Sequence, residues 1–272
     1  MNEAELLFTE ILDYERVDLY QNKRFCLDKD KASLAASVLK RRIRGEPLQY
    51  ILGKTEFMGL KFKVNQDVFI PRPETEILVE TVINLVRSSG IGARSILDLG
   101  TGSGCIAVSV AKFLPNTNIT ATDISESAIR IAKQNAVINN AKINFLCSDL
   151  FNNSELQTMN YELIISNPPY IPTDEIATLQ PEISYEPQIA LDGGREGMDF
   201  YRRIISVAAG YLEREGFLVL EMGYNQLGPI RKLFENSGCL EIIEVVKDYN
   251  HIDRVIVARK IPNPNTQITN KL

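Results

Sequence analysis

The 272-residue sequence predicts an α/β protein built around a mostly parallel, doubly wound β-sheet. Two observations predict this class. After Gly92, short β-rich runs alternate with longer helical stretches, and this alternation is typical of a parallel sheet with helices on both faces. A glycine-rich turn follows the first of these runs, where a buried strand leads into a helix and the backbone can pass close to a ligand.

Before the sheet, the sequence predicts a small helical bundle over residues 1–53. Apolar side chains at residues 6–12 recur at nearly helical spacing and form one stripe. Asp30 is a candidate N-cap for a second helix, which Gly45 and Pro47 would end. Two helices of this length indicate a satellite domain and not a catalytic core.

Residues 54–75 are expected to form a β-hairpin and an irregular linker. Residues 55–64 alternate in character and are broken at Gly59, as in a short hairpin. Two prolines then prevent regular structure until Pro73, which suits the first turn of a helix that runs to about Arg87.

The sheet domain is predicted over residues 76–261. The last two strands are joined by only about ten residues, too few for a helical crossover, so they should pair antiparallel at one edge. The polar segment 262–272 has no apolar period and is predicted to be disordered. The strand candidates are residues 95–99, 118–122, 143–147, 163–166, 217–221, 240–246 and 255–258, and the helical stretches are about 104–113, 125–138, 198–213 and 225–236.

The charge balance of the sequence argues against nucleic acid as a stable binding partner. With 30 Lys and Arg against 35 Asp and Glu, the net charge is −5. A large, stable nucleic-acid-binding surface is not expected, because phosphate neutralisation needs an excess of cations. The basic run at residues 40–44 fits the charged last turn of a helix better than a local nucleic-acid patch.

Targeting and metal signals are not found in the sequence. The first residues lack the basic and apolar segments of a signal peptide, and no apolar run approaches the length needed to span a bilayer. The four cysteines lie far apart and the chain has one histidine, so no zinc framework is expected. These observations predict a cytoplasmic protein without a membrane segment and without a metal.

The glycine-rich turn comprises Gly100, Thr101, Gly102, Ser103 and Gly104. Glycines at alternate positions allow positive φ and close approach of the backbone to a ligand, and the helix that follows presents free N–H groups suited to a carboxylate or phosphate. The spacing is G-x-G-x-G, and not the G-x-G-x-x-G of dinucleotide folds. We therefore expect a ligand without a pyrophosphate, whose carboxylate lies near the start of the helix.

Two acidic residues end the next strands. Asp123 can accept both hydroxyls of a ribose, as acidic residues do in nucleotide-binding β-α-β units; the alternative is that it caps the helix beginning at Ser125. Asp149 is placed to meet the exocyclic amine of an adenine, with Leu150 as an apolar contact for the ring. The alternative for Asp149 is a solvated turn residue.

The string Asn167-Pro168-Pro169-Tyr170 ends a further strand. Its prolines fix two φ angles and remove two backbone donors, so the turn is stiff. The Asn167 side chain and the Pro168 carbonyl can accept both hydrogens of one –NH₂ group, with Tyr170 as a flat wall. This geometry suits a planar amide or amino group. The alternative is a surface turn, but the three motifs at successive strand ends together predict a ligand site at the carboxyl edge of one sheet.

These motifs resemble the class I S-adenosylmethionine-dependent methyltransferases that modify a planar nitrogen. Four strings, separated along the chain, narrow the resemblance to the bacterial peptide chain release factor glutamine methyltransferases, the PrmC/HemK family. The strings are PLQYILG at 47–53, FIPRPETE at 69–76, DLGTGSGCIA at 98–107 and SYEP at 184–187.

The resemblance implies a Rossmann-like sheet of seven mostly parallel strands with an antiparallel last strand, joined by a β-hairpin linker to an N-terminal helical bundle that binds the release factor. It implies transfer of a methyl group from S-adenosyl-L-methionine to the glutamine side-chain nitrogen in the Gly-Gly-Gln loop of class 1 release factors, which modulates translation termination and leaves S-adenosyl-L-homocysteine. A ribosomal-protein glutamine or a nucleic-acid adenine amino group is the alternative acceptor. The enzyme is expected to be a monomer.

The resemblance also implies roles for individual residues. The glycine turn would hold the methionine part of the cofactor, Asp123 the ribose and Leu150 the adenine. Arg72, Glu74 and Glu186 would shape the peptide channel, or would simply tether the linker between the two domains. The cofactor-binding set is Gly100, Thr101, Gly102, Ser103, Gly104, Asp123, Asp149, Leu150 and Asn167, and the catalytic and substrate-binding set is Asn167, Pro168, Pro169 and Tyr170.

Overall fold

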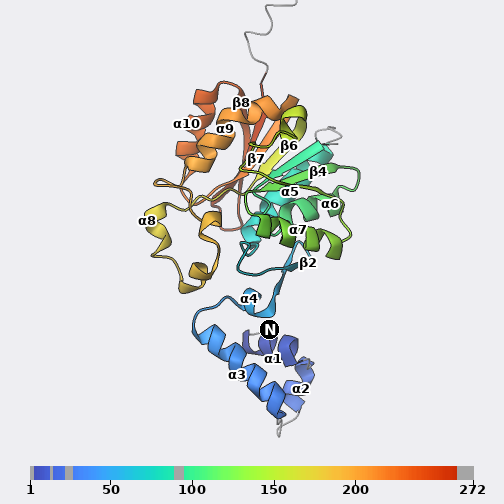
Figure 1. Ribbon diagram of the computed structural model, residues 1–272. Helices are drawn as coiled ribbons and strands as arrows, with labels where there is room; N and C mark the ends of the chain where they lie inside the picture. Colours follow the sequence, from blue (N-terminus) through green and yellow to red (C-terminus); the bar gives the residue numbers. More distant parts are fainter. Residues whose placement is uncertain (1–2, 13–14, 22–26, 89–94, 262–272) are drawn as a thin grey trace, which may run out of the picture.

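The computed structural model describes residues 3–12, 15–21, 27–88 and 95–261 (Figure 1). Within these residues, seven strands form one sheet in the order β5-β4-β3-β6-β7-β9-β8. Neighbouring strands are parallel, except that β9 is antiparallel to both β7 and β8. The predicted mostly parallel sheet with an antiparallel last strand is therefore confirmed. The strands are β3 (Ser95–Leu99), β4 (Asn118–Asp123), β5 (Asn144–Cys147), β6 (Tyr161–Ser166), β7 (Leu212–Glu221), β8 (Leu240–Lys247) and β9 (Asp253–Lys260).

The central strands are buried on both faces, which explains their continuous apolar runs. Alternate residues of each strand belong to different cores: Leu163 and Ile165 of β6 face one cluster, while Ile164 faces the other. Helices α5 (Pro73–Ser88), α6 (Cys105–Phe113) and α7 (Glu126–Ile138) contribute to the first cluster. Helices α9 (Asp199–Tyr211) and α10 (Leu227–Ser237) cover the second. The sheet therefore has helices on both faces, as predicted.

The N-terminal part contains more helices than the two that were expected. Its described residues form α1 (Glu3–Leu12), α2 (Arg16–Gln21), α3 (Lys29–Ile43) and the short α4 (Leu48–Leu52). Figure 1 shows α1, α2 and α3 grouped at one end of the molecule, away from the sheet. The predicted tail at residues 262–272 lies outside the described residues.

The predicted N-cap of α3 was wrong by two positions. Asp28 is the cap: its backbone is extended and its Oδ1 atom accepts a hydrogen bond from the Lys31 amide at 2.8 Å. Asp30 already lies in the first turn, where its carboxylate is near the positive end of the helix dipole. Which aspartate caps the helix depends on the residue at which the chain first becomes helical. The spacing of apolar residues does not define that residue to within two positions.

The predicted hairpin is confirmed as β1 (Lys54–Phe57) paired antiparallel with β2 (Leu60–Lys63). A fully buried asparagine of α7, Asn135, holds it in place. Asn135 Oδ1 accepts from the Lys63 amide at 2.6 Å, and Nδ2 donates to the Lys63 carbonyl at 2.9 Å and to the Ser103 carbonyl at 2.8 Å. One side chain therefore joins the hairpin, α7 and the glycine turn.

Replacing Asn135 with alanine should lower the free energy of unfolding by about 3 kcal/mol, because buried backbone groups lose their hydrogen-bond partners. Urea denaturation of the purified protein measures this change. Asn139→Ala is the matched control on the same helix, since Asn139 makes a single side-chain hydrogen bond to the hairpin, at the Lys61 carbonyl; about 1 kcal/mol is expected there. Equal losses in the two variants would contradict the assigned role of Asn135.

Candidate active site

A pocket of about 220 Å³ lies at the carboxyl edge of the sheet, where β3, β4, β5 and β6 end. The structure brings the sequence-predicted motifs together there, although they are separated by up to seventy residues of the chain. Gly104, Arg72, Glu74 and Glu186 do not line the pocket. The predicted residues that do are Gly100, Thr101, Gly102, Ser103, Asp123, Asp149, Leu150, Asn167, Pro168, Pro169 and Tyr170.

The glycine turn adopts the backbone that its sequence predicts. Gly100, Gly102 and Gly104 all have positive φ, at 72°, 54° and 81°, a region that favours residues without a Cβ. A Cβ on Gly104 would lie 3.0 Å from the Cβ of Ala132, so this glycine allows α6 and α7 to approach each other. A Cβ on Gly100 or Gly102 would meet nothing within 4 Å; these two positions border open space.

Asp98 holds the glycine turn in place through a hydrogen bond with Thr101. It is fully buried at the end of β3, and Thr101 Oγ1 donates a hydrogen bond to its Oδ2 atom at 2.7 Å. Burial raises the pKa of Asp98 to about 7, and the Thr101 hydrogen bond opposes that rise. Thr101 is also held through its backbone amide, which donates to the Thr122 carbonyl at 2.8 Å. The turn is therefore fixed to both β3 and β4.

Asp123 connects the glycine turn with α7. Its Oδ2 atom accepts from the Gly102 amide at 2.8 Å, and Oδ1 accepts from the Ser125 amide at 2.9 Å. Ser125, and not Asp123, is the N-cap of α7, because its hydroxyl accepts from the Ala128 amide. Burial raises the pKa of Asp123. Each carboxylate oxygen has a second lone pair, so both remain able to accept a ligand hydroxyl.

Asp149 and Leu150 form the next part of the wall. Arg203 of α9 donates to Asp149 Oδ2 at 2.7 Å, and both side chains are partly exposed. Leu150 has a φ of 52°, which is uncommon for a residue with a branched side chain. No sequence pattern predicted the contact of Arg203, which lies fifty-four positions after its partner. An adenine amine at Asp149 would share that carboxylate with the arginine.

The Asn-Pro-Pro-Tyr corner forms the opposite wall of the pocket. Asn167 Nδ2 donates a hydrogen bond to Thr75 Oγ1 in the first turn of α5, at 3.1 Å. Because Thr75 binds the amide nitrogen, the carbonyl oxygen of Asn167 stays available to accept a hydrogen bond from a ligand. Within the described residues, no hydrogen bond to the Pro168 carbonyl is found. Thr75 was not predicted as a site residue, although it belongs to the 69–76 string.

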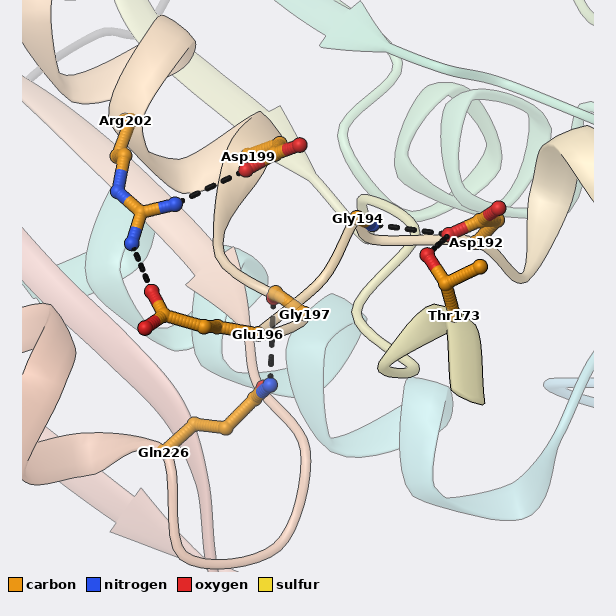
Figure 2. Close-up of polar contacts among 8 residues, drawn as sticks. All are labelled: Thr173, Asp192, Gly194, Glu196, Gly197, Asp199, Arg202 and Gln226. Carbon is orange, nitrogen blue, oxygen red and sulfur yellow. Dashed lines mark hydrogen bonds and ion pairs between the residues drawn. The ribbon is translucent and has the colours of Figure 1, made fainter. Parts of the chain in front are cut away.

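The loop before α9 is held by a set of polar contacts (Figure 2). Asp192 Oδ1 accepts from the Thr173 hydroxyl at 2.7 Å and from the Gly194 amide at 2.9 Å. Gln226 Nε2 donates to the Gly197 carbonyl at 3.3 Å. The segment after the corner also contains α8 (Thr173–Ile176) and two 3-10 turns, at Pro181–Tyr185 and Gln188–Ala190, which the sequence did not predict.

Gln226 and the loop before α9 also contact the Asn-Pro-Pro-Tyr corner directly. Gln226 Nε2 also donates to the Tyr170 carbonyl at 2.9 Å. A Cβ on Gly193 would lie 2.8 Å from both the Pro169 carbonyl oxygen and the Tyr170 Cα. Only glycine allows so close an approach of two backbones. The Gly-rich run at residues 193–197 was the available sequence signal for this contact.

Arg72 and Glu186 contact each other outside the pocket wall. Arg72 Nη2 forms an ion pair with Glu186 Oε1, and the Ile70 amide donates to Glu186 Oε2 at 3.1 Å. Burial raises the pKa of Glu186 although Arg72 counteracts it. The Arg72 guanidinium lies 4.8 Å from the centre of the Phe69 ring. The contacts tether the linker to the 3-10 segment; a role of these residues and of Glu74 in the peptide channel stays a prediction.

Fold and pocket together define a methyltransferase of the small-domain class. Residues 72–181 match the family model Methyltransferase small domain, and residues 1–53 match PrmC N-terminal domain. The solved 16S rRNA N2 G1207 methyltransferase of T. thermophilus, in complex with AdoMet and guanosine, has the same fold. It is 19% identical with a TM-score of 0.54, over 76% of this chain and 50% of that one.

Two relatives are similar over nearly the whole chain. The protein named Release factor glutamine methyltransferase in Thermodesulfovibrio yellowstonii is 42% identical, over 96% of this chain and 92% of the relative. Its namesake in Fusobacterium nucleatum subsp. nucleatum is 41% identical, over 95% and 73%. The chain belongs to the release factor glutamine methyltransferase family.

Proposed function

We propose that this enzyme methylates the side-chain amide nitrogen of the glutamine in the Gly-Gly-Gln motif of class 1 peptide chain release factors. The methyl donor is S-adenosyl-L-methionine, the product is S-adenosyl-L-homocysteine, and the modification modulates translation termination. The names of the relatives support the acceptor. The observation that carries the proposal is the Asn-Pro-Pro-Tyr corner, in which Thr75 engages the nitrogen of the Asn167 amide and leaves its oxygen to the ligand.

The residues of the pocket fit the proposed cofactor. The glycine turn borders open space at Gly100 and Gly102, which suits a ligand that lies directly on the backbone. Asp123 has lone pairs left for ribose hydroxyls after its two backbone hydrogen bonds. Asp149 and Leu150 follow on the same wall and are proposed to contact the adenine. The T. thermophilus enzyme of the same fold was solved with AdoMet, which agrees with this proposal.

An amide nitrogen is a poor nucleophile because its lone pair is delocalised into the carbonyl. The cofactor supplies a methyl group that its sulfonium already activates. Asn167 Oδ1 and the Pro168 carbonyl accept the two hydrogens of the glutamine –NH₂, orient its nitrogen and offset the positive charge that develops on it. Catalysis is then positioning and electrostatics, and the proton is lost to water after transfer.

We further infer that residues 1–53 bind the release factor and that residues 54–75 link this part to the methyltransferase domain at 76–261. The alternative acceptors, a ribosomal-protein glutamine and a nucleic-acid adenine, are not favoured by the names of the relatives. No helix among the described residues is long and apolar enough to cross a membrane. A monomeric state, a cytoplasmic location and the lack of stable nucleic-acid binding stay predictions.

Methyl transfer from radiolabelled S-adenosyl-L-methionine tests the proposed function. Four acceptors are compared: a class 1 release factor, the same factor with its Gly-Gly-Gln glutamine replaced by alanine, a ribosomal-protein mixture and adenine-containing DNA. Label on the intact release factor alone is the expected result. Label on the alanine variant at the same level, or on the DNA, would refute the proposed acceptor.

A further inference from the structure

A buried carboxyl group lies behind the Asn-Pro-Pro-Tyr corner and has no part in the reaction described above. Glu221 ends β7 and is 2% exposed. Its Oε2 atom has no hydrogen-bond partner among the described residues. Burial raises the pKa of Glu221 to about 7, while hydrogen bonds with the Thr75 and Asn167 side chains counteract the rise. A carboxyl group of this kind changes its protonation near neutral pH.

Thr75 connects Glu221 with the corner. It is 2% exposed, lines the pocket and accepts the hydrogen bond from Asn167 Nδ2. A hydroxyl group has one proton and two lone pairs. When that proton is donated to the Glu221 carboxylate, only the lone pairs of Thr75 Oγ1 remain, and these can bind an N–H group but not a carbonyl oxygen.

This restriction decides which way the Asn167 amide faces. With Nδ2 against Thr75, the carbonyl oxygen is available to a substrate –NH₂; in the flipped orientation, two acceptors, the Asn167 Oδ1 atom and the Thr75 Oγ1 lone pairs, would face each other. We propose that Glu221 is a positioning residue for the proposed reaction, because its carboxylate, acting through the Thr75 hydroxyl and directly on the Asn167 N–H, fixes the Asn167 amide with its oxygen available to the substrate glutamine. This inference rests on the proposed function.

The arrangement requires ionised Glu221, because a carboxylate only accepts hydrogen bonds. Protonated Glu221 can donate to Thr75 instead, and the Thr75 proton is then able to bind the Asn167 oxygen. Of the charged groups around Glu221, Arg254 of β9 lowers its pKa and Glu74 of α5 raises it. The other titratable neighbours have pKa values raised by burial and stay neutral near pH 7: Tyr170, Tyr201 and Cys105. The rate should therefore rise with pH through about 7.

Single-turnover methylation of the release factor, followed between about pH 5.5 and pH 8.5 at saturating cofactor, tests the inference. The wild-type rate should rise with a midpoint near pH 7, as the ionised fraction of Glu221 increases. Glu221→Gln should lower the rate at pH 8 by about 30-fold and abolish the midpoint, since a glutamine amide donates to Thr75. The affinity for S-adenosyl-L-homocysteine, measured by calorimetry, should stay within about twofold of the wild-type value.

Two substitutions at Thr75 separate positioning from packing. Thr75→Val has nearly the same shape without the hydroxyl and should show part of the rate loss of Glu221→Gln, because the direct contact between Glu221 and Asn167 remains. The double variant should be no slower than Glu221→Gln alone, because Thr75 acts together with Glu221 on the same amide. Thr75→Ser keeps the hydroxyl and should restore the wild-type rate and pH midpoint.

A Glu221→Gln or Thr75→Val enzyme with the wild-type rate and pH midpoint would overturn the inference. The thermal unfolding transition of each variant shows whether it is folded in the assay. If either variant is unfolded, Thr75→Ser is compared with the wild type instead, and a Thr75→Ser enzyme without the pH midpoint would also overturn the inference. If wild-type enzyme fails to methylate any release factor, the proposed function itself is wrong, and the two failures are distinguished.

Discussion

Replacing Asn167 with alanine should lower the single-turnover rate of methyl transfer by about 10³-fold, while the Kd for S-adenosyl-L-homocysteine changes by less than about threefold. The variant removes an acceptor that is positioned for the transition state, and losses of 10² to 10³ are typical of such groups. Asn167 is anchored through its nitrogen to Thr75, so its oxygen is the atom whose loss is measured. Labelled methyl transfer gives the rate, and calorimetry gives the Kd.

The matched control is Asn152→Ala, which removes an exposed asparagine that does not line the pocket. It should leave the rate and the Kd unchanged. If Asn167→Ala weakens binding of S-adenosyl-L-homocysteine as much as it slows transfer, then Asn167 serves the cofactor and its assignment as the substrate acceptor is wrong.

Replacing Asp123 with alanine should weaken S-adenosyl-L-homocysteine binding by about 100-fold, or about 2.7 kcal/mol. The change removes the carboxylate proposed for the ribose hydroxyls and also leaves the Gly102 and Ser125 amides without their acceptor. Charge-assisted hydrogen bonds of this type are worth about 1.5–3 kcal/mol each. Calorimetry measures the affinity, and the rate at saturating cofactor should fall far less.

Asp123→Asn distinguishes the ribose role from the structural one. It keeps one acceptor oxygen and should give an intermediate affinity with a nearly normal thermal unfolding transition. Should Asp123→Ala lower the unfolding temperature while binding S-adenosyl-L-homocysteine normally, the carboxylate would only join the glycine turn to α7, and the ribose contact would have to come from another residue.

The sequence predicted those features that are encoded locally. Alternation of apolar runs with helical stretches predicted every strand of the large sheet that the structure describes, to within two residues at either end except at β7, which begins five residues before the predicted run at 217–221. The glycine turn, Asp123 and the Asn-Pro-Pro-Tyr string were predicted to lie together because the ends of parallel strands share one edge. The structure places them around one pocket.

Contacts between distant segments could not be predicted in this way. Glu221 reads as the last residue of an apolar strand, and Thr75 as an unremarkable position in the first turn of a helix. Their proximity to Asn167 arises only when β7 lies beside β6 and α5 packs over them. The same holds for Asn135, whose amide contacts both a hairpin and a turn that are far from it in the sequence. Single polar residues on amphipathic helices carry no periodic signal of such partners.

The position of β9 inside the sheet has a consequence for how the protein folds. This strand is the last in the described chain, yet it separates β7 from β8, and residues 255–258 are completely buried. The strands of the sheet therefore cannot pair in the order of synthesis. The backbone N–H and C=O groups at one edge of β7 stay unpaired until β9 has been made. Pairings of this kind slow folding and leave an aggregation-prone intermediate. We therefore expect folding to depend more on rapid pairing of β9 with β7 than on early formation of the strands β3 to β6.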